Sequence, residues 1–301
     1  MLKLKFIQML PNYFVFHKLN IRITCWRIII YLNVYLFFYM NCSSIICTYD
    51  WPEALGFVLS SVASQSILPN EIIVADDGSN NSTEMLVEEY SKLLSVPVIH
   101  SWQEDNGCRI PHSRNRAVSK SHYEYIIMVD GDTVLHHDFI KDHKRFANKR
   151  VYIQGSRVLL QPEFSSNIFK ENIFSKPSFF SKDSKNKLNM IRIPLISLLF
   201  SYFKSQNINR IRGCNFSVYK EDILKVNGFN EEITTWGRED SEFVQRLFNI
   251  GLKKKHLKFS GIQYHLFHKE RIHNNDNNEI LQNTIDNNII WCSLGIDAYL
   301  K

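Results

Sequence analysis

The apolar positions in the first half of the chain form short runs separated by stretches with helical spacing. Residues 44–47, 71–75, 96–101 and 125–129 are apolar runs of strand length, as expected for strands buried on both faces of a sheet. Because strand and helix patterns alternate with short connections, the sequence predicts right-handed βαβ units and a mostly parallel sheet.

Helices are predicted between these strands. The first follows Pro52, which suits a first helical turn, and the others cover residues 82–94 and 113–121. In the first two, the apolar positions at helical spacing are Leu55, Val58, Leu59, Val62, Met85, Leu86 and Leu93. The predicted fold class is α/β, with helices flanking the sheet of one large domain.

Polar clusters follow three of the predicted strands. They read Thr48-Tyr49-Asp50, Asp76-Asp77-Gly78-Ser79 and Asp130-Gly131-Asp132. In an open α/β sheet, ligands bind at the carboxyl ends of the strands, so we expect the clusters to line one crevice. Carboxylates there suit a hard divalent cation that shares a ligand's phosphates, although the last cluster alone fits an Asp-Gly turn as well. Neither GxGxxG nor GxxxxGK[ST] occurs in this half, which disfavours a Rossmann dinucleotide site and a P-loop.

Charge is unevenly distributed along the 301 residues, whose formal net charge is +6. Residues 1–39 contribute +5 and residues 161–220 contribute +7, which leaves −6 for the rest. A mildly acidic body with two basic segments argues against a nucleic-acid partner and for local contact with something anionic. The six cysteines are scattered without metal-binding spacing, which favours reduced thiols and a cytoplasmic protein.

The N-terminal segment allows several interpretations. Residues 28–40 are strongly apolar but shorter than the roughly 20 residues of a spanning helix, and Asn33 interrupts them. Residues 1–39 are therefore predicted to be a basic apolar extension that acts as a peripheral anchor, or a non-native start before Met40. A membrane span and a signal peptide remain alternatives.

Two blocks of motifs together resemble the family-2 glycosyltransferases of the GT-A fold. The first block runs from Ser-Ile-Ile-Cys-Thr-Tyr-Asp through Glu-Ile-Ile-Val-Ala-Asp-Asp-Gly-Ser to Ile-Met-Val-Asp-Gly-Asp, over residues 43–135. The second, in residues 212–240, includes Arg-Gly-Cys-Asn-Phe-Ser and Trp-Gly-Arg-Glu-Asp, and looks like the galactosyltransferase-like acceptor half of these enzymes. The blocks cover roughly half of the chain.

The resemblance implies a nucleoside-diphosphate sugar, UDP in first place, as the donor. Thr48 and Tyr49 would lie against the nucleobase, and Asp77 would accept a hydrogen bond from it, although Asp77 also fits a turn cap. Asp130 would approach the ribose. Arg109 would reach the diphosphate, with Arg114 and Arg116 as competitors, because a planar guanidinium matches phosphate oxygens.

The resemblance also implies a metal site. Asp132 would bind Mg²⁺ or Mn²⁺ that bridges the diphosphate. A late histidine completes the metal shell in many of these enzymes, and His268 matches that position better than His265 does. An isolated pair of histidines is, however, more often structural.

The second block would supply the acceptor site and the chemistry. By analogy, Asp240 is the general base and Glu239 orients the acceptor, while Trp236, Gly237 and Asn215 bind it. Carboxylates in a first helical turn are also favoured by the helix dipole, which is the structural alternative for both. A single in-line displacement would invert the anomeric centre.

Residues 161–211 form a basic and aromatic variable insertion in which the resemblance fades. This composition suits an anionic membrane face or a lipid-linked acidic acceptor, and equally a loop that closes over the donor. A short amphipathic element is expected in residues 191–203, which Pro194 interrupts.

These observations predict an inverting hexosyl- or N-acetylhexosaminyltransferase of cell-surface polysaccharide or lipopolysaccharide synthesis. It would be cytoplasmic, peripheral to the inner face of the membrane, and use a glycan or lipid-linked glycan acceptor. The rivals are a non-catalytic sugar-nucleotide-binding protein, a sugar-1-phosphate nucleotidyltransferase and a processive polysaccharide synthase. The last would need several membrane spans and a Gln-x-x-Arg-Trp motif, which Gln245-Arg246-Leu247 does not supply. The predicted donor-binding half covers residues 40–160. The acceptor and catalytic half covers residues 212–272, and a helical tail covers residues 273–301.

Overall fold

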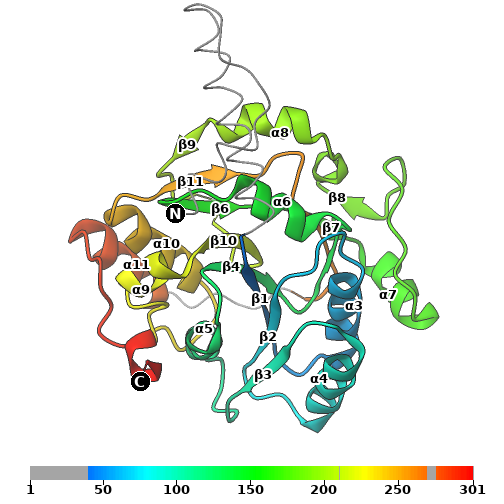
Figure 1. Ribbon diagram of the computed structural model, residues 1–301, viewed down its shortest axis with the longest axis horizontal. Coiled ribbons are helices and arrows are strands. Elements are labelled where there is room, and N and C mark those ends of the chain that lie inside the picture. The colour runs from blue at the N-terminus through cyan, green and yellow to red at the C-terminus, as the bar shows by residue number, and fades with distance from the viewer. Residues whose placement is uncertain (1–39, 210, 270–275, 301) are drawn as a thin grey trace, which may run out of the picture. The chain divides into compact units, whose positions relative to one another are not determined.

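The computed structural model describes residues 40–209, 211–269 and 276–300. Within them, an eight-stranded sheet has the order β3-β2-β1-β4-β10-β6-β11-β9 (Figure 1). Its strands are β1 Cys42–Thr48, β2 Glu71–Asp76, β3 Val98–Trp102, β4 Tyr125–Asp130, β6 Val151–Gln154, β9 Lys204–Ser205, β10 Asn215–Tyr219 and β11 Lys253–His256. The predictions for residues 1–39 fall outside the described residues.

The half of the sheet formed by β1 to β4 is parallel, and its three inner strands are almost entirely buried. Strand β1 lies between β2 and β4 and runs parallel to both, with Thr48 opposite Asp76 and Cys47 opposite Asp130. Every residue of β2 is buried, because helices cover both faces of a parallel sheet. Helices α3 and α4 lie on one side of these strands and α5 on the other (Figure 1).

The helices of this half agree with the pattern of apolar residues. Helix α3 begins at its predicted proline and spans Pro52–Ala63, and α4 spans Asn81–Leu93. Helix α5, Ile110–Lys120, begins three residues before the prediction, because Pro111 stands in its first turn. The α/β class with flanking helices is thus confirmed, while the far half of the sheet is mixed, since β10 runs antiparallel to both of its neighbours.

A second sheet brings residues 262–265 back beside β5, the strand that follows β4. Within the described residues it has four strands, in the order β5-β12-β7-β8. Strand β12 pairs antiparallel with β5, which places His265 opposite Thr133, the residue after Asp132. The strands are β5 Thr133–Leu135, β7 Ser156–Leu160, β8 Ser184–Lys185 and β12 Ile262–His265.

The remaining helices surround the two sheets. They are α6 Phe139–Phe146, α7 Pro162–Glu171, η1 Lys187–Met190, α8 Pro194–Ser201, α9 Lys220–Lys225, α10 Glu239–Asn249, α11 Asp276–Asp286 and η2 Ile296–Tyr299. Pro194 begins α8 instead of interrupting it, since a proline is compatible with the first turn. No helix among the described residues combines the length and apolar character needed to cross a bilayer.

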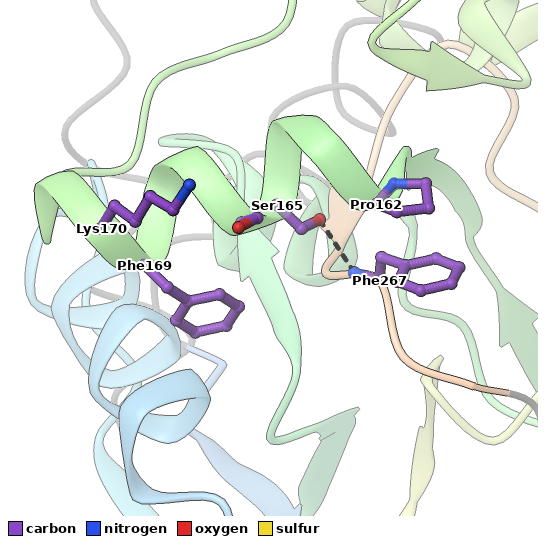
Figure 2. A pocket seen from close by; sticks show the side chains of 6 residues that line it. Pro162, Ser165, Phe169, Lys170 and Phe267 are labelled. Carbon is purple, nitrogen blue, oxygen red and sulfur yellow. Dashed lines mark hydrogen bonds between the residues drawn. The ribbon is translucent and has the colours of Figure 1, made fainter.

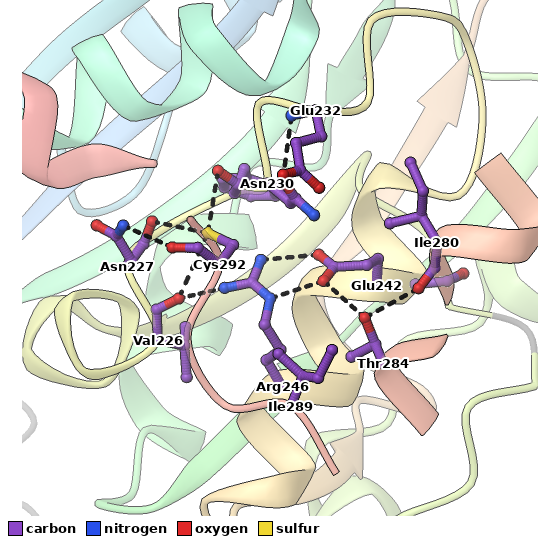
Figure 3. Close-up of polar contacts among 12 residues, drawn as sticks. Val226, Asn227, Asn230, Glu232, Glu242, Arg246, Ile280, Thr284, Ile289 and Cys292 are labelled. Carbon is purple, nitrogen blue, oxygen red and sulfur yellow. Dashed lines mark hydrogen bonds and ion pairs between the residues drawn. The ribbon is translucent and has the colours of Figure 1, made fainter. Parts of the chain in front are cut away.

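Helix α10 is anchored by a buried ion pair. Arg246 donates to both carboxylate oxygens of Glu242 at 2.8 Å and also to the Val226 carbonyl, and both charged side chains are fully buried (Figure 3). Thr284 of α11 donates to the same carboxylate at 3.1 Å. Because a buried pair is costly unless its polar atoms are satisfied, this network fixes α10 and holds the tail against it.

Candidate active site

The three polar clusters meet at one edge of the main sheet. Backbone hydrogen bonds join them directly: Asp77 N–H donates to the Thr48 carbonyl at 3.1 Å, and Gly131 N–H donates to the Cys47 carbonyl at 2.6 Å. The close approach explains the glycine. A Cβ on Gly131 would lie 2.9 Å from the Cys47 carbonyl oxygen and 3.1 Å from Thr48, so only glycine fits between the two aspartates.

The predicted nucleobase residues lie side by side. Thr48 is buried, whereas Tyr49 is 42% exposed and donates to Asp105 at 3.1 Å. Asp77 accepts from the Gln103 amide at 2.6 Å and from the Arg109 backbone N–H at 2.9 Å. Burial raises the pKa of Asp77 above its ordinary value, although these two donors oppose the shift. The exposed tyrosine ring beside a fixed carboxylate is a geometry that can take a flat base.

Arg109 and Arg114, two candidates for binding the diphosphate, have different partners in the structure. The Arg109 guanidinium donates to the Glu104 carbonyl, and its contact with Asp77 is made by the backbone. Arg114 is buried, with Nη2 at 3.5 Å from Asp130 Oδ1 and Nη1 at 3.6 Å from Glu239 Oε1. The predicted role of Arg109 stays a prediction, and Arg114 is the arginine that joins the two carboxylates.

The carboxylates around Arg114 have perturbed acidities. Burial and the nearby Asp132 and Asp240 charges raise the pKa of Asp130 to about 6, against the attraction of Arg114. Burial and Asp240 raise the pKa of Glu239 to about 7, again opposed by Arg114. Perturbed carboxyl groups gathered at strand ends are typical of a functional site.

Asp132 lies beside both candidate histidines. His268 Nε2 is 3.2 Å from Asp132 Oδ2 and His265 Nε2 is 3.7 Å from Asp132 Oδ1. One ligand atom from each of the three residues lies within 4.8 Å of the others. The sequence motifs ranked His268 ahead of His265, and the pairing of β12 with β5 brings His265 to the cluster as well.

The hydrogen bonds of the histidines suit a bound cation. His265 Nδ1 donates to the Leu266 carbonyl and His268 Nδ1 donates to the Lys269 carbonyl, each at 2.9 Å. Since a carbonyl only accepts, each neutral ring carries its proton on Nδ1 and turns the Nε2 lone pair toward Asp132. Asp132 Oδ1 is buried without a hydrogen-bond partner in the structure. Two imidazole lone pairs and an unpartnered carboxylate oxygen are a donor set that fits Mn²⁺ better than Mg²⁺, because Mg²⁺ prefers oxygen ligands.

Glu239 and Asp240 occupy the first turn of α10, as predicted. Glu239 is buried and accepts from Gly237 N–H at 3.1 Å, whereas Asp240 is half-buried and accepts from Ser241 N–H at 2.7 Å. Asp240 is therefore the more accessible of the two. The preceding loop is held by Asn277 of α11, which donates to the Gly237 carbonyl at 2.7 Å.

Asn215 lies in a buried polar network. Its amide donates to the Ser156 and Gly261 carbonyls at 2.9 and 3.0 Å, and its oxygen accepts from His143 Nε2 at 3.0 Å. These bonds give Asn215 a structural role, and its contact with an acceptor stays a prediction. Trp236 is half-buried beside Gly237 in the loop before α10.

Sequence reasoning missed three residues at the site. Gln103 orients Asp77, and Trp51 lies with its ring 6.2 Å from that of His268. The Arg157 charge is near enough to lower the pKa of both Asp130 and His265, and its Nε is buried without a hydrogen-bond partner. A lone charge in the strand pattern of residues 156–160 was the only available signal for it.

An open pocket of about 450 Å³ adjoins the histidine cluster. Figure 2 shows it between α7 and the segment after β12, where Ser165 accepts from the Phe267 backbone N–H. Phe169 in its wall packs against Trp51 in a tilted arrangement, at a ring distance of 5.6 Å. Apolar rings with a few polar groups suit the binding of a sugar face.

Residues 43–206 match the family described as Glycosyl transferase family 2, and residues 197–269 match the one described as N-terminal domain of galactosyltransferase. The first match covers more than half of the chain, so the protein belongs to glycosyl transferase family 2. The match reaches residue 206, well into the segment whose motifs fade. The resemblance stated from the motifs is confirmed.

Relatives and solved structures agree with this family. The chondroitin synthase of Escherichia coli is 27% identical over 233 residues, which are 69% of this chain and 32% of that protein. The chain thus spans about a third of that relative's length. Staphylococcus aureus TarS 1-349 in complex with UDP-GlcNAc has a TM-score of 0.59 at 17% identity, covering 86% of this chain and 69% of that one. A Pyrobaculum calidifontis mannosyltransferase in complex with GDP-Man and Mn²⁺ has a TM-score of 0.53 at 16% identity, with 77% and 59% covered.

Proposed function

We propose that the protein is an inverting, metal-dependent glycosyltransferase that transfers a sugar from a UDP-sugar to a glycan or lipid-linked glycan. The observation that carries the proposal is the cluster of Asp132, His265 and His268 at the strand ends, beside Asp130, whose pKa both Asp132 and Asp240 raise. The UDP-GlcNAc complex of TarS and the Mn²⁺ complex of the mannosyltransferase support the donor and the metal.

The donor would bind at the edge of the parallel strands. Tyr49 stacks on the base, Asp77 accepts from it, and Asp130 contacts the ribose. Asp132, His265 and His268 would hold Mn²⁺ or Mg²⁺, which offsets the charge of the diphosphate as it departs. The Arg157 charge adds to this stabilisation, because its guanidinium lies near the same carboxylates.

The acceptor would bind beside Trp236 and Gly237. Its hydroxyl oxygen attacks the anomeric carbon as the bond to the diphosphate oxygen breaks, and Asp240 takes the hydroxyl proton. A single displacement inverts the anomeric centre. Glu239, fixed by Arg114 and by Gly237 N–H, positions the first turn of α10 for this step.

The pathway we infer is the synthesis of a cell-surface polysaccharide or lipopolysaccharide, at the inner face of the membrane. The chondroitin synthase relative supports a polysaccharide product. The transferred group is a hexose or an N-acetylhexosamine. Family membership disfavours the nucleotidyltransferase alternative, so a non-catalytic sugar-nucleotide-binding protein is the remaining rival.

The test is a panel of UDP-sugars and GDP-mannose, scored for Mn²⁺-dependent binding and then for transfer or hydrolysis. Wild type should bind one donor tightly and lose it in EDTA, whereas donor binding indifferent to EDTA would contradict the metal site. Asp132→Asn should weaken Mn²⁺ itself, measured calorimetrically. Asp240→Asn should retain donor binding but lose about 10²-fold or more of kcat; equal activity would exclude Asp240 as the base.

A further inference from the structure

Helix α8 exposes more apolar surface than its packing uses. Ser197 and Ser201, one turn apart, face the protein and are 1% and 8% exposed, and Leu198 packs against a buried cluster beside them. Other large apolar residues face solvent, with Leu195 76% and Leu199 65% exposed. A helix packed only against its own domain turns its apolar side inward, so this orientation indicates that another apolar phase meets α8.

The exposed apolar surface continues past the end of the helix. Tyr202 is 73% and Phe203 is 76% exposed, just before β9, the outermost strand of the main sheet. Contiguous exposed side chains of this size mark an interaction surface, whereas single ones are ordinary. We call Leu195, Leu199, Tyr202 and Phe203 the α8 face; it lies at the end of the sheet opposite β3 (Figure 1).

Lysines border the α8 face. Lys204 follows Phe203, and the Lys258 ammonium lies 5.6 Å from the Phe200 ring. A hollow of about 220 Å³ lies between them, lined by Phe200, Phe203, Lys204, Ser205, Lys254, His256 and Lys258. The sequence has no Asp or Glu at 184–220 or 243–269, the segments that supply these residues. These two segments therefore contribute only positive charge to the border of the face.

We propose that the α8 face docks on a bilayer that contains anionic phospholipid. Leucine and aromatic side chains would enter the boundary between headgroups and acyl chains, while Lys204 and Lys258 contact lipid phosphates. The charge complementarity favours this occupant over a second copy of the chain, since two such faces would bring their lysines together. The inference deepens the membrane contact of the proposed function and rests on that part of it.

The experiment is flotation of the full chain with vesicles, without donor or acceptor. Wild type should float with vesicles of phosphatidylcholine plus phosphatidylglycerol, and less with phosphatidylcholine alone or at high salt. Lys204→Glu/Lys258→Glu should lower the partition coefficient by at least roughly tenfold, given the contribution of each lysine near an anionic surface. Lys92→Glu/Lys120→Glu is the matched charge control and should bind like wild type.

The apolar part is tested by Leu195→Ser/Leu199→Ser, which should reduce flotation by roughly tenfold or more. Its control is Met85→Ser/Leu93→Ser on α4, where the side chains are 64% and 68% exposed. Unchanged flotation of both α8 variants would overturn the proposal and assign binding to another part of the chain. A dimer that dissociates on Leu195→Ser/Leu199→Ser, without vesicle binding, would overturn it in favour of self-association. Mn²⁺ and donor binding, measured on the same variants, tests the transferase assignment separately.

Discussion

His143 makes the stability of the protein sensitive to acid. The side chain is fully buried on α6, where Nε2–H donates to Asn215 at 3.0 Å and Nδ1 accepts from the Ser217 hydroxyl at 2.7 Å. Ser217 in turn accepts from the Tyr125 hydroxyl at 2.7 Å. Both ring nitrogens are thus satisfied in the neutral form. Burial lowers the pKa of His143 to about 4 from an ordinary 6.5.

The sign and size of the effect follow from this shift. Between pH 6.5 and about 4, the unfolded chain binds a proton at His143 that the folded chain does not, so stability falls as the pH falls through this window. At about 1.4 kcal/mol per pKa unit, the loss is about 3 kcal/mol on reaching pH 4. Above pH 6.5 this contribution is fully present.

The assay is urea unfolding at a series of pH values, for wild type and His143→Gln. The glutamine removes the titration, so the difference in free energy of unfolding between the two proteins should shrink by about 3 kcal/mol from pH 7 to pH 4. The comparison cancels the opposite effect of carboxyl groups with raised pKa, such as Glu239. Parallel pH profiles for the two proteins would refute the assignment.

Three further substitutions have predicted effects on stability or on KM. Gly131→Ala should destabilise the fold by about 1–3 kcal/mol and weaken donor binding, because its Cβ would meet the Cys47 carbonyl oxygen at 2.9 Å; an unchanged melting temperature would contradict this. Arg114→Gln should cost about 3 kcal/mol in urea unfolding, since it leaves buried Glu239 without its cation; a loss below about 1 kcal/mol would show that the ion pair matters little. Asn277→Ala should raise the KM for the acceptor more than that for the donor, because the amide holds the loop before α10. An acceptor KM that rises no more than the donor KM would exclude that role.

The strand ends of the parallel sheet could be predicted because they depend on local patterns. Each apolar run ends in a polar cluster, and parallel strands carry their ends to one edge, so Asp77, Asp130 and Asp132 were expected together. The first turn of α10 could also be predicted from the sequence, since Glu239 and Asp240 precede apolar residues at helical spacing.

The contributions of distant segments were not predictable in the same way. His265 joins Asp132 through the antiparallel pairing of β12 with β5, which no local pattern encodes. Arg114 resembles a surface residue of a polar helix, yet it is buried between carboxylates from two other segments. The orientation of α8 also escaped prediction, since helical spacing shows which residues share a side but not which side faces the protein.

The contacts of α11 have a consequence for the order of events during synthesis. The loop before Glu239 depends on Asn277, and the Glu242–Arg246 pair is completed by Thr284. A nascent chain that has emerged through His268, three residues past β12, already contains every residue of the metal cluster and both carboxylates of α10. Domains fold as their segments leave the ribosome, so the ribosome-bound intermediate would acquire the donor site first. It would bind an acceptor only after α11 has also emerged and packed.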